Sequence, residues 1–436
     1  MISSLIFISL LAVAFVFFAK RILFIKRNIL LGQKLKITDN SPKRWQLMLS
    51  VAIGQSKMVK RPLAGIMHIF VYVGFLLVNI EMLEIMLDGV FHTHRLFSFM
   101  GGFYSFLINS FEFFAMAVIV ACVVFLVRRN VGKLKRFHSA EMTKGPKSDA
   151  NIILFTEIAL MSAFLVMNAS DALLQNLGSP HYVATGSFYI SSQLMPLFQN
   201  LSEGTLIFIE RFAWWFHITG VLVFMNYVTY SKHLHIFLAF PNVYYSKLTK
   251  IGHLPSMESV RKEVELMMSD PYAAPANDAA QDEPAKFGAS DVHDFSWKTL
   301  LDAYTCTECG RCTSVCPANL TGKKLSPRKL LMDVRDRSEE IGKQMDIQKA
   351  DYKSDQKSLL SYIASEEIWA CTTCNACAVA CPVNINHTEI IYSLRRYLVM
   401  EQSSAPASLN NCFKNIENNG APWQFSPEDR LLWAEE

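Results

Sequence analysis

The sequence of 436 residues has little charge: 18% of its residues are Asp, Glu, Lys or Arg, against about 25% in soluble globular proteins. It contains no G-x-G-x-x-G motif, no Walker phosphate loop and no H-E-x-x-H zinc motif, so it offers no flavin, nicotinamide or nucleotide site of its own. No pattern of basic and aromatic residues suggests nucleic acid as a partner. Because 51% of the residues are hydrophobic, we predict a membrane protein with a soluble part.

What the sequence does contain is one cysteine phrase that occurs twice, at 306–317 and at 371–382. Both copies read C-x2-C-x2-C-x3-C-P. In this run the first three thiolates bind one [4Fe-4S] cluster and the fourth binds the other cluster. We therefore predict two [4Fe-4S] clusters. The predicted ligands are Cys306, Cys309, Cys312 and Cys381 for one cluster, and Cys371, Cys374, Cys377 and Cys316 for the other.

Two other uses of these cysteines fit less well. A structural zinc site with four cysteines takes two separated C-x2-C pairs rather than a triplet followed by Cys-Pro. Disulfides need an oxidising compartment, and the topology below places both phrases in a reducing one. Of the two remaining cysteines, Cys122 lies in an apolar run and is expected to be buried. Cys412 fits interface packing and metal ligation equally well.

Five apolar stretches each approach the ~20 residues needed to cross a bilayer as a helix. They cover roughly 2–25, 63–87, 103–127, 151–176 and 205–230. The first is not typical of a cleaved signal peptide, because no basic residue precedes it and no small-residue cleavage site follows. We expect it to be retained as a span.

The distribution of Lys and Arg predicts the orientation of these spans. Basic residues concentrate in 20–61 and 128–147, whereas 88–102 has one and 177–203 has none. By the positive-inside rule the N-terminus lies outside and residues 231–436 lie in the cytoplasm. The protein is thus expected in the inner (cytoplasmic) membrane as a multi-pass protein.

Three histidines in or beside the spans are candidate haem ligands. His68 lies near the cytoplasmic end of the second span, and His235 follows the fifth, so both should lie at similar depth. Two neutral imidazoles that face each other between helices can hold haem b. His217 precedes His235 by 18 positions, about five helical turns, and is expected on the same face at another depth. Ordinary interfacial or hydrogen-bonded histidines are the alternative.

The five spans, the outside N-terminus and the paired histidines near the fifth span resemble the haem-b membrane subunit of respiratory nitrate reductase. They also resemble the membrane subunits of heterodisulfide reductase. In that family a second histidine follows the second-span histidine after ten residues and gives two haems, but Val78 stands there in this chain. The resemblance therefore implies one haem b, with a second dependent on a partner for His217. The candidate partners are Met82, Met86, His94 and His181.

The part of the chain after the spans is also expected to be helical, so the predicted fold class is all-α. Few runs of alternating β-branched residues occur, and Ser326-Pro327 is typical of a helix start. The two-cluster part resembles the α-helical ferredoxin modules of succinate dehydrogenase, anaerobic glycerol-3-phosphate dehydrogenase and heterodisulfide reductase. The expected domains are a transmembrane haem b domain (1–240), a juxtamembrane segment and linker (241–294), a two-[4Fe-4S] α-helical ferredoxin domain (295–402) and a docking tail (403–436).

The tail resembles the segment that joins the ferredoxin module to a catalytic domain with cysteine-rich CCG repeats in membrane iron–sulfur oxidoreductases. No Cys-Cys-Gly occurs in this chain, so we expect a separate CCG-domain subunit to which the tail docks. Its aromatic residues Trp423, Phe425 and Trp433 favour an interface over a free disordered end.

These expectations together predict an oxidoreductase subunit that transfers electrons between a soluble catalytic partner and a quinone, either menaquinone or ubiquinone. The resemblance implies an electron-transfer flavoprotein or another dehydrogenase as a further partner, and either direction of electron flow. A non-catalytic anchor and relay is the alternative. Ion transport is a third hypothesis, disfavoured by the lack of an internal repeat. A carboxylate beside the quinone would carry protons, but the sequence singles out none of the five in the spans, Glu81, Glu84, Glu112, Glu157 and Asp171.

Overall fold

A computed structural model describes residues 2–132, 134–143, 145–254 and 286–435, together with positions 256, 257, 260, 261, 264, 265 and 268. The expected linker (241–294) falls partly outside these residues, at 269–285 and at positions 255, 258, 259, 262, 263, 266 and 267. Helices are the regular elements of the described chain, and its one recorded β-bridge joins Gln33 to Ser296. The predicted all-α fold class is confirmed.

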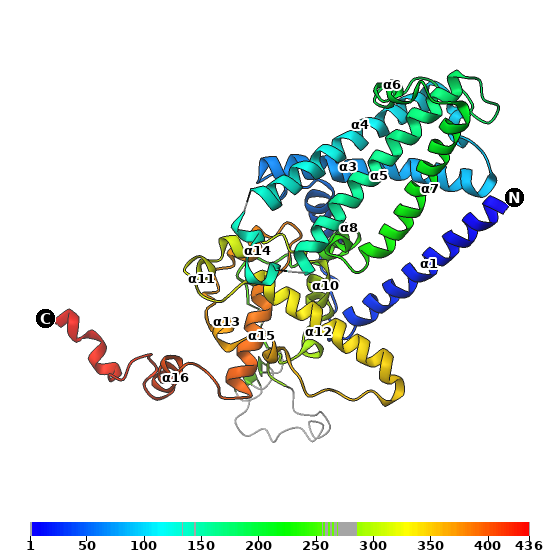
Figure 1. Cartoon of the computed structure of the whole chain (residues 1–436). Coiled ribbons are helices and arrows are strands. Elements are labelled where there is room, and N and C mark those ends of the chain that lie inside the picture. The colour runs from blue at the N-terminus through cyan, green and yellow to red at the C-terminus, as the bar shows by residue number, and fades with distance from the viewer. Residues whose placement is uncertain are drawn as a thin grey trace.

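Five helices are long and apolar enough to cross a membrane, as predicted. They are α1 (Ile2–Ile29), α3 (Pro62–Phe91), α4 (Gly102–Leu126, continued by a π-helical turn Val127–Val131), α5 (Gly145–Asn176) and α7 (Glu203–Val228). Helix α5 packs against both α4 and α7, and α3 packs against α4. Helix α1 borders this bundle along α3 and α7 (Figure 1).

The remaining helices are shorter. They are α2 (Ser41–Met48), α6 (Met195–Phe198), α8 (His235–Tyr244), α10 (Trp297–Thr305), α11 (Pro317–Leu320), α12 (Pro327–Gln348), α13 (Ser365–Trp369), α14 (Ala376–Ala380), α15 (His387–Met400), α16 (Ala407–Asn419) and α17 (Leu432–Glu435). Helix α12 begins where the sequence predicts, because the Ser326 hydroxyl accepts from the Lys329 N–H and Pro327 needs no N–H partner at this position.

The C-terminal module, residues 286–402, has a hydrophobic core that takes in segments from elsewhere in the chain. Met48 and Val51 from the α2 region and Val243 from α8 pack into the same core as Leu300 of α10. The core also includes Ala289 and Val292, which are 1% and 0% exposed. The module therefore starts earlier than the expected boundary at 295, and it is built partly from membrane-proximal segments.

Helix α1 also ties the module to the bundle. The Asn28 amide near its end donates to the Tyr304 hydroxyl at 2.9 Å, and Arg21 forms an ion pair with Glu339 of α12 at 2.7 Å. Beyond the helix, the N–H of Gln33 donates to the carbonyl of Phe295 at 2.7 Å. The module is thus attached to the bundle at several points, at the end opposite the N-terminus (Figure 1).

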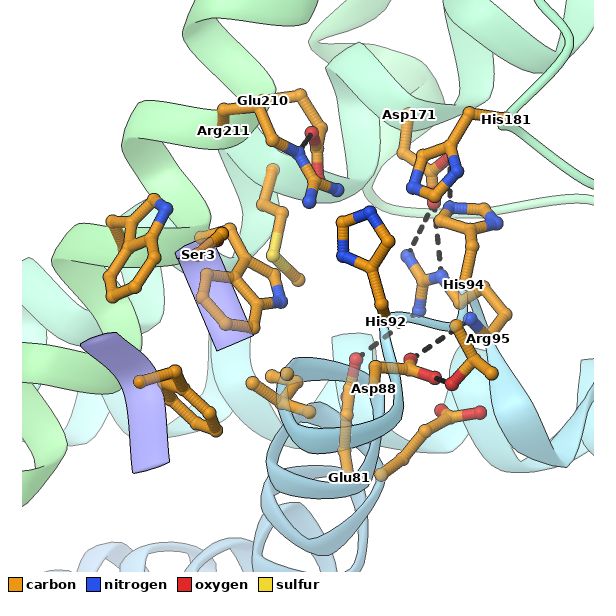
Figure 2. A pocket seen from close by; sticks show the side chains of 18 residues that line it. Ser3, Glu81, Asp88, His92, His94, Arg95, Asp171, His181, Glu210 and Arg211 are labelled. Atoms are coloured by element: carbon orange, nitrogen blue, oxygen red, sulfur yellow. Dashed lines mark hydrogen bonds and ion pairs between the residues drawn. The ribbon is translucent and has the colours of Figure 1, made fainter. Parts of the chain in front are cut away.

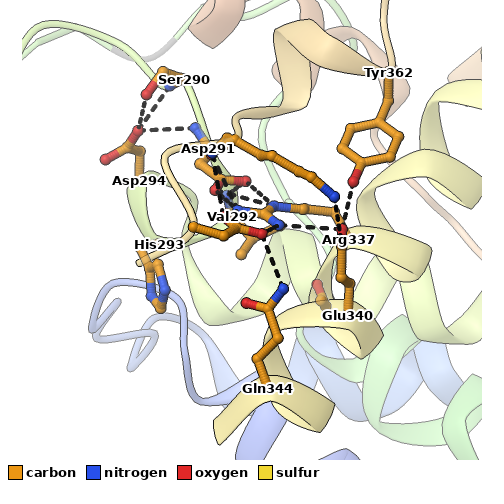
Figure 3. Close-up of polar contacts among 12 residues, drawn as sticks. Ser290, Asp291, Val292, His293, Asp294, Arg337, Glu340, Gln344 and Tyr362 are labelled. Atoms are coloured by element: carbon orange, nitrogen blue, oxygen red, sulfur yellow. Dashed lines mark hydrogen bonds and ion pairs between the residues drawn. The ribbon is translucent and has the colours of Figure 1, made fainter. Parts of the chain in front are cut away.

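Arg337 of α12 is the polar centre of the module (Figure 3). Its side chain is 1% exposed and forms ion pairs with Asp291 at 2.8 Å and Asp355 at 2.7 Å. A third pair joins it to Glu340 at 3.1 Å. These bonds tie the segment before α10 and the segment after α12 to the same helix. The hydrogen bond from Arg337 holds the pKa of Asp355 well below its usual range.

Replacing Arg337 with Met should destabilise the module by about 3 kcal/mol or more, because breaking a buried ion pair leaves its partners uncompensated. The measurement is the thermal midpoint of the loss of helical circular dichroism in the detergent-solubilised protein. Lys357→Met is the matched control, since Lys357 pairs with Glu340 at 2.7 Å and is 52% exposed. Equal midpoints for the two variants would contradict the central role of Arg337.

Candidate functional site

The two cysteine phrases come together in the module and exchange their fourth cysteines. Cys306, Cys309 and Cys312 line one pocket with Cys381 of the second phrase. Cys316 of the first phrase lies close enough to Cys371 and Cys377 to act on their thiols electrostatically. We call Cys306, Cys309, Cys312 and Cys381 the membrane-side set and Cys316, Cys371, Cys374 and Cys377 the solvent-side set. These are the two groups that the spacing predicts.

Local backbone features shape the loop of the membrane-side set. Gly310 has a φ of 68°, which favours glycine, and a Cβ there would lie 2.5 Å from Nη1 of Arg328. Backbone N–H groups also point at sulfur: Ile385 donates to Sγ of Cys381 at 3.4 Å, and Thr373 donates to Sγ of Cys371 at 3.3 Å. Such donors stabilise negative charge on a thiolate.

Burial and the neighbouring thiols act against ionisation of these cysteines. Burial raises the pKa of Cys306, Cys377 and Cys381 to about 12 in each case. Cysteine binds a metal as the thiolate, so binding of a cluster releases protons from these thiols. The bound iron would then stabilise the negative charge of the thiolates, which burial alone disfavours. Each set brings four cysteines to one part of the module, which is the number that all-cysteine ligation of a [4Fe-4S] cluster requires.

The two sets differ in exposure at one cysteine. Cys316 and Cys377 of the solvent-side set are buried, as are Cys306, Cys312 and Cys381 of the membrane-side set, but Cys374 is exposed. The solvent-side set is therefore the one that a soluble partner can approach.

Charged residues dock the loop of the membrane-side set onto the bundle. Lys232, in the turn between α7 and α8, forms an ion pair with Glu308 at 2.7 Å, and Arg335 of α12 holds the other oxygen of Glu308 at 2.8 Å. Arg311 donates to the Lys57 carbonyl at 2.9 Å. The loop that carries Cys306, Cys309 and Cys312 thus rests on the segments that flank the spans.

Next to this loop, a cavity of about 470 Å³ opens between α3, α4, α5 and α8. His68 and His235 both line it, and their ring centroids are 6.4 Å apart. Nδ1 of His235 donates to the Lys232 carbonyl at 3.0 Å. In this tautomer Nε2 of His235 carries no proton, and its lone pair is available to a metal. Nδ1 of His68 is buried without a partner. Burial lowers the pKa of His235 and so favours the neutral ring that binds metals.

The rings of His68 and His235 are tilted by 39° to each other, and their centroid separation of 6.4 Å leaves room for a metal ion between two imidazoles. His233 lies beside the pair, with its ring 5.5 Å from that of His235. Thr307 lines both this cavity and the pocket of the membrane-side set, so the two sites are neighbours.

The rim of the histidine cavity is basic. Arg128, Arg129, Arg136 and Lys232 all line it. Nε of Arg129 and both Nε and Nη1 of Arg136 are buried and have no hydrogen-bond partner among the described residues, whereas Nη2 of Arg129 donates to the Pro146 carbonyl at 3.2 Å. Unpaired guanidinium N–H groups are suited to carboxylates. In the sequence these basic residues indicate only the orientation of the spans, although their position after an apolar stretch is a signal for a site at the membrane surface.

His217 is not part of this cavity. Its Nδ1 donates to the Leu160 carbonyl at 2.9 Å, its Nε2 is buried without a partner, and its ring lies beside Phe164. The expectation that His217 and His235 share one helix face is wrong, because α7 ends at Val228 and His235 begins α8 after a turn.

The two outer-loop candidates for a partner of His217 lie in a separate polar pocket at the other end of the bundle (Figure 2). There His94 contacts His181, with ring centroids 5.5 Å apart, and its Nε2 donates to Asp171 at 3.1 Å. Arg95 is the centre of this cluster: it binds Asp171 through two N–H groups at 3.0 and 2.8 Å and reaches Glu81 at 3.4 Å.

Two further acids of the spans are also hydrogen-bonded. Glu84 accepts from the Tyr104 hydroxyl at 2.8 Å. Glu112 accepts from the Asn168 amide at 3.2 Å and from the N–H of Ile190 at 2.9 Å. Four of the five acids named from the sequence are thus structural partners at the end of the bundle away from the module.

Comparisons with known proteins agree with this geometry. The 4Fe-4S dicluster domain family matches residues 305–385, which include all eight cysteines of the two phrases. The protein is therefore a multi-pass, membrane-anchored chain of five long apolar helices with a C-terminal domain for two [4Fe-4S] clusters. No solved structure matches the chain.

Two curated relatives match most of the chain. The "Probable iron-sulfur-binding oxidoreductase FadF" of Bacillus subtilis is 28% identical over 97% of this chain and 59% of its own length. The "EtfAB:quinone oxidoreductase" of Syntrophomonas wolfei is 26% identical over 88% of this chain and 53% of its own length. The chain thus spans little more than half of these relatives.

A shorter match is to a heterodisulfide reductase subunit. One subunit of the "Ferredoxin/F(420)H(2)-dependent CoB-CoM heterodisulfide reductase" of Methanosarcina acetivorans is 31% identical over 24% of this chain and 52% of its own length. The predicted similarity to heterodisulfide reductase subunits is confirmed.

If the fourth cysteines are exchanged, Cys381→Ala and Cys309→Ala should perturb the same cluster, although the two cysteines belong to different phrases. Cys316→Ala and Cys374→Ala should perturb the other. Electron paramagnetic resonance of the reduced protein, with iron and sulfide content, checks this. Cys412→Ala is the matched control, since Cys412 lies outside both sets. If Cys381→Ala instead gave the spectrum of Cys374→Ala, each phrase would hold its own cluster.

Proposed function

We propose that the chain is the quinone-reactive membrane subunit of an iron–sulfur oxidoreductase complex. The observation that carries this proposal is the presence of three sites: the solvent-side set, which is exposed at Cys374, the mostly buried membrane-side set, and the imidazole pair in a cavity between membrane helices. Clusters and haem, when bound, supply one-electron transfer. The chain's own role is to hold these sites next to one another and to open one end to a soluble partner and the other to the bilayer.

The proposed ligands follow from the sites. The membrane-side and solvent-side sets each hold one [4Fe-4S] cluster, and His68 and His235 hold one haem b. An apolar cavity with two opposed imidazoles fits the macrocycle, and the unpaired N–H groups of Arg129 and Arg136 fit its two carboxylates. His217 also has a free, buried Nε2, but no second imidazole faces it in the described part of the chain, so we propose one haem rather than two.

The module lies on the cytoplasmic side in this proposal. The basic loops that flank α3 and α4 contact the module, through Lys57 and through Arg136, whose carbonyl accepts from Arg328 at 2.6 Å. Clusters persist in a reducing compartment, and basic loops remain in the cytoplasm. The N-terminus is then outside.

The partner is a soluble CCG-type iron–sulfur subunit, fed by an electron-transfer flavoprotein or another dehydrogenase. The Syntrophomonas relative is named for EtfAB and for quinone. This name supports an electron-transfer flavoprotein as the partner and a quinone as the substrate. The tail supports a docking role, because α16 has no buried residue and Trp423, Phe425 and Trp433 are 48%, 68% and 76% exposed. In Figure 1 the tail extends away from the module.

The alternative is a non-catalytic anchor and relay with the quinone site on another chain. An imidazole pair serves either role, because a relay also needs a haem, but a cavity that extends past the pair along α3 and α5 favours the quinone-reactive role. Menaquinone and ubiquinone both remain candidate substrates.

Replacing His235 with Ala should abolish haem b and leave both cluster signals, because the pair loses one ligand while the module keeps its cysteines. Pyridine haemochrome measures haem per chain, with about one expected in the unmodified protein, and electron paramagnetic resonance measures the clusters. His138→Ala is the matched control, since His138 is an exposed histidine at the same end of the bundle. A haem content unchanged in His235→Ala would rule out this ligand pair.

Ending the chain after Gln402 should release the catalytic partner without loss of clusters or haem. The measurement is mass spectrometry of the subunits that copurify with the chain from membranes. The substitutions Trp423→Ala, Phe425→Ala and Trp433→Ala in a chain of full length test whether the aromatic residues account for the effect. An intact complex with the shortened chain would show that the tail is not the docking segment.

A further inference from the structure

The histidine cavity continues beyond the imidazole pair toward the middle of the membrane helices. Tyr72 lies one turn beyond His68 on α3, and Leu76 lies another turn on; both line the cavity. From the facing side, Leu154 and Glu157 of α5 line it as well. The cavity therefore has two parts: one at the imidazoles and the basic rim, and one that is apolar except for Tyr72 and Glu157.

Glu157 differs from the other acids of the membrane helices. The structure records no hydrogen bond and no ion pair between Glu157 and any residue it describes, whereas Glu81, Glu84, Glu112 and Asp171 are all partnered. Its neighbour in the cavity is Cys122. A carboxyl group inside a membrane span costs free energy, and without a partner it has no structural role that would offset this cost. Such groups mark functional sites.

The phenol of Tyr72 is the second polar group without a partner in this part of the cavity. No hydrogen bond of its hydroxyl to a described residue is recorded, and the residue is half-buried. Tyr72 and Glu157 come from different helices, α3 and α5, and line the same apolar space. A ligand between them would meet a hydrogen-bond donor and a carboxyl group within otherwise apolar walls, as small-molecule sites commonly provide.

The bilayer has direct access to this part of the cavity. Phe75 and Leu76 both line it, yet they are 38% and 50% exposed on the surface of the bundle. An apolar molecule dissolved in the membrane can therefore enter from the side, between α3 and its neighbours.

We propose that the inner part of the histidine cavity binds the headgroup of a quinone, with Glu157 as the residue that exchanges protons with it and Tyr72 as a hydrogen-bond donor to one carbonyl. This inference rests on the proposed function and names the site at which it is carried out. Reduction adds two electrons and two protons to the quinone, and each C=O becomes C–OH. Clusters and haem held by the two cysteine sets and by His68 and His235 would supply the two electrons, with the soluble partner as their source, and Glu157 passes the two protons in turn. Oxidation of the quinol releases the same electrons and protons in reverse.

The test uses the purified full-length protein with its haem and clusters, and menadiol as the quinol probe. Stopped-flow absorbance follows reduction of the haem by menadiol, and dithionite measures reduction that needs no quinone site. Glu157→Gln should slow reduction by menadiol ~10²-fold or more, the usual loss when a general acid–base group is removed. Reduction by dithionite, haem content and cluster signals should not change. Glu157→Asp should recover part of the rate, because it restores a carboxyl group.

Tyr72→Phe should weaken binding of a hydroxyquinoline N-oxide, a quinol analogue whose fluorescence changes on binding, by about tenfold, the scale of one hydrogen bond. Glu112→Gln is the matched control, since it makes the same change in the neighbouring span at a residue outside this cavity. It should leave both the menadiol rate and inhibitor binding unchanged.

The outcomes separate this inference from the proposed function. If menadiol fails to reduce the unmodified protein, the proposed function fails and this site fails with it. If menadiol reduces Glu157→Gln at the unmodified rate, the quinone site is elsewhere and the proposed function stands. Loss of haem in Glu157→Gln would show that Glu157 supports the haem rather than a quinone, and would also overturn the inference.

Discussion

The architecture of the module depends on the exchange of one cysteine between two phrases that are far apart in the sequence. The membrane-side set is incomplete without Cys381, and the solvent-side set is incomplete without Cys316. Each set therefore draws cysteines from both phrases, and α12 lies between the two phrases in the sequence. Because binding a cluster supplies folding free energy, loading either site stabilises the approach of the two phrases and so supports the other site.

The same loops connect the module to the membrane helices. Glu308 lies within the first phrase and is held by Lys232 from the turn that precedes His235. A buried ion pair of this kind contributes little net stability but is costly to break, so it fixes the position of the thiol loop relative to the imidazole pair. Electron transfer between neighbouring centres requires such fixed positions, and the several contacts of α1, α2 and α8 with the module serve the same purpose.

Charge inside the bundle is divided between two ends. At the end away from the module, Arg95 forms ion pairs with Asp171 and Glu81. The burial of these two acids is therefore explained by their pairing with Arg95. At the module end, the Nε atoms of Arg129 and Arg136 and the carboxyl group of Glu157 have no hydrogen-bond partner among the described residues, and all three residues border a cavity. Satisfied polar groups stabilise a fold, whereas unsatisfied ones beside a cavity indicate what it is built to bind.

The sequence alone determined the features that depend on local spacing. Five helices follow from apolar runs matched to the bilayer thickness, and the grouping of the thiols follows from the short steps between cysteines. Tertiary structure decided whatever depends on contacts between distant segments. These features are the pairing of the acids, the approach of Arg136 to the histidine cavity, and the inclusion of residues before 295 in the module core. Tertiary structure also separated His217 from His235, because helical spacing predicts a shared face only while one helix continues, and the break after Val228 could not be read from periodicity.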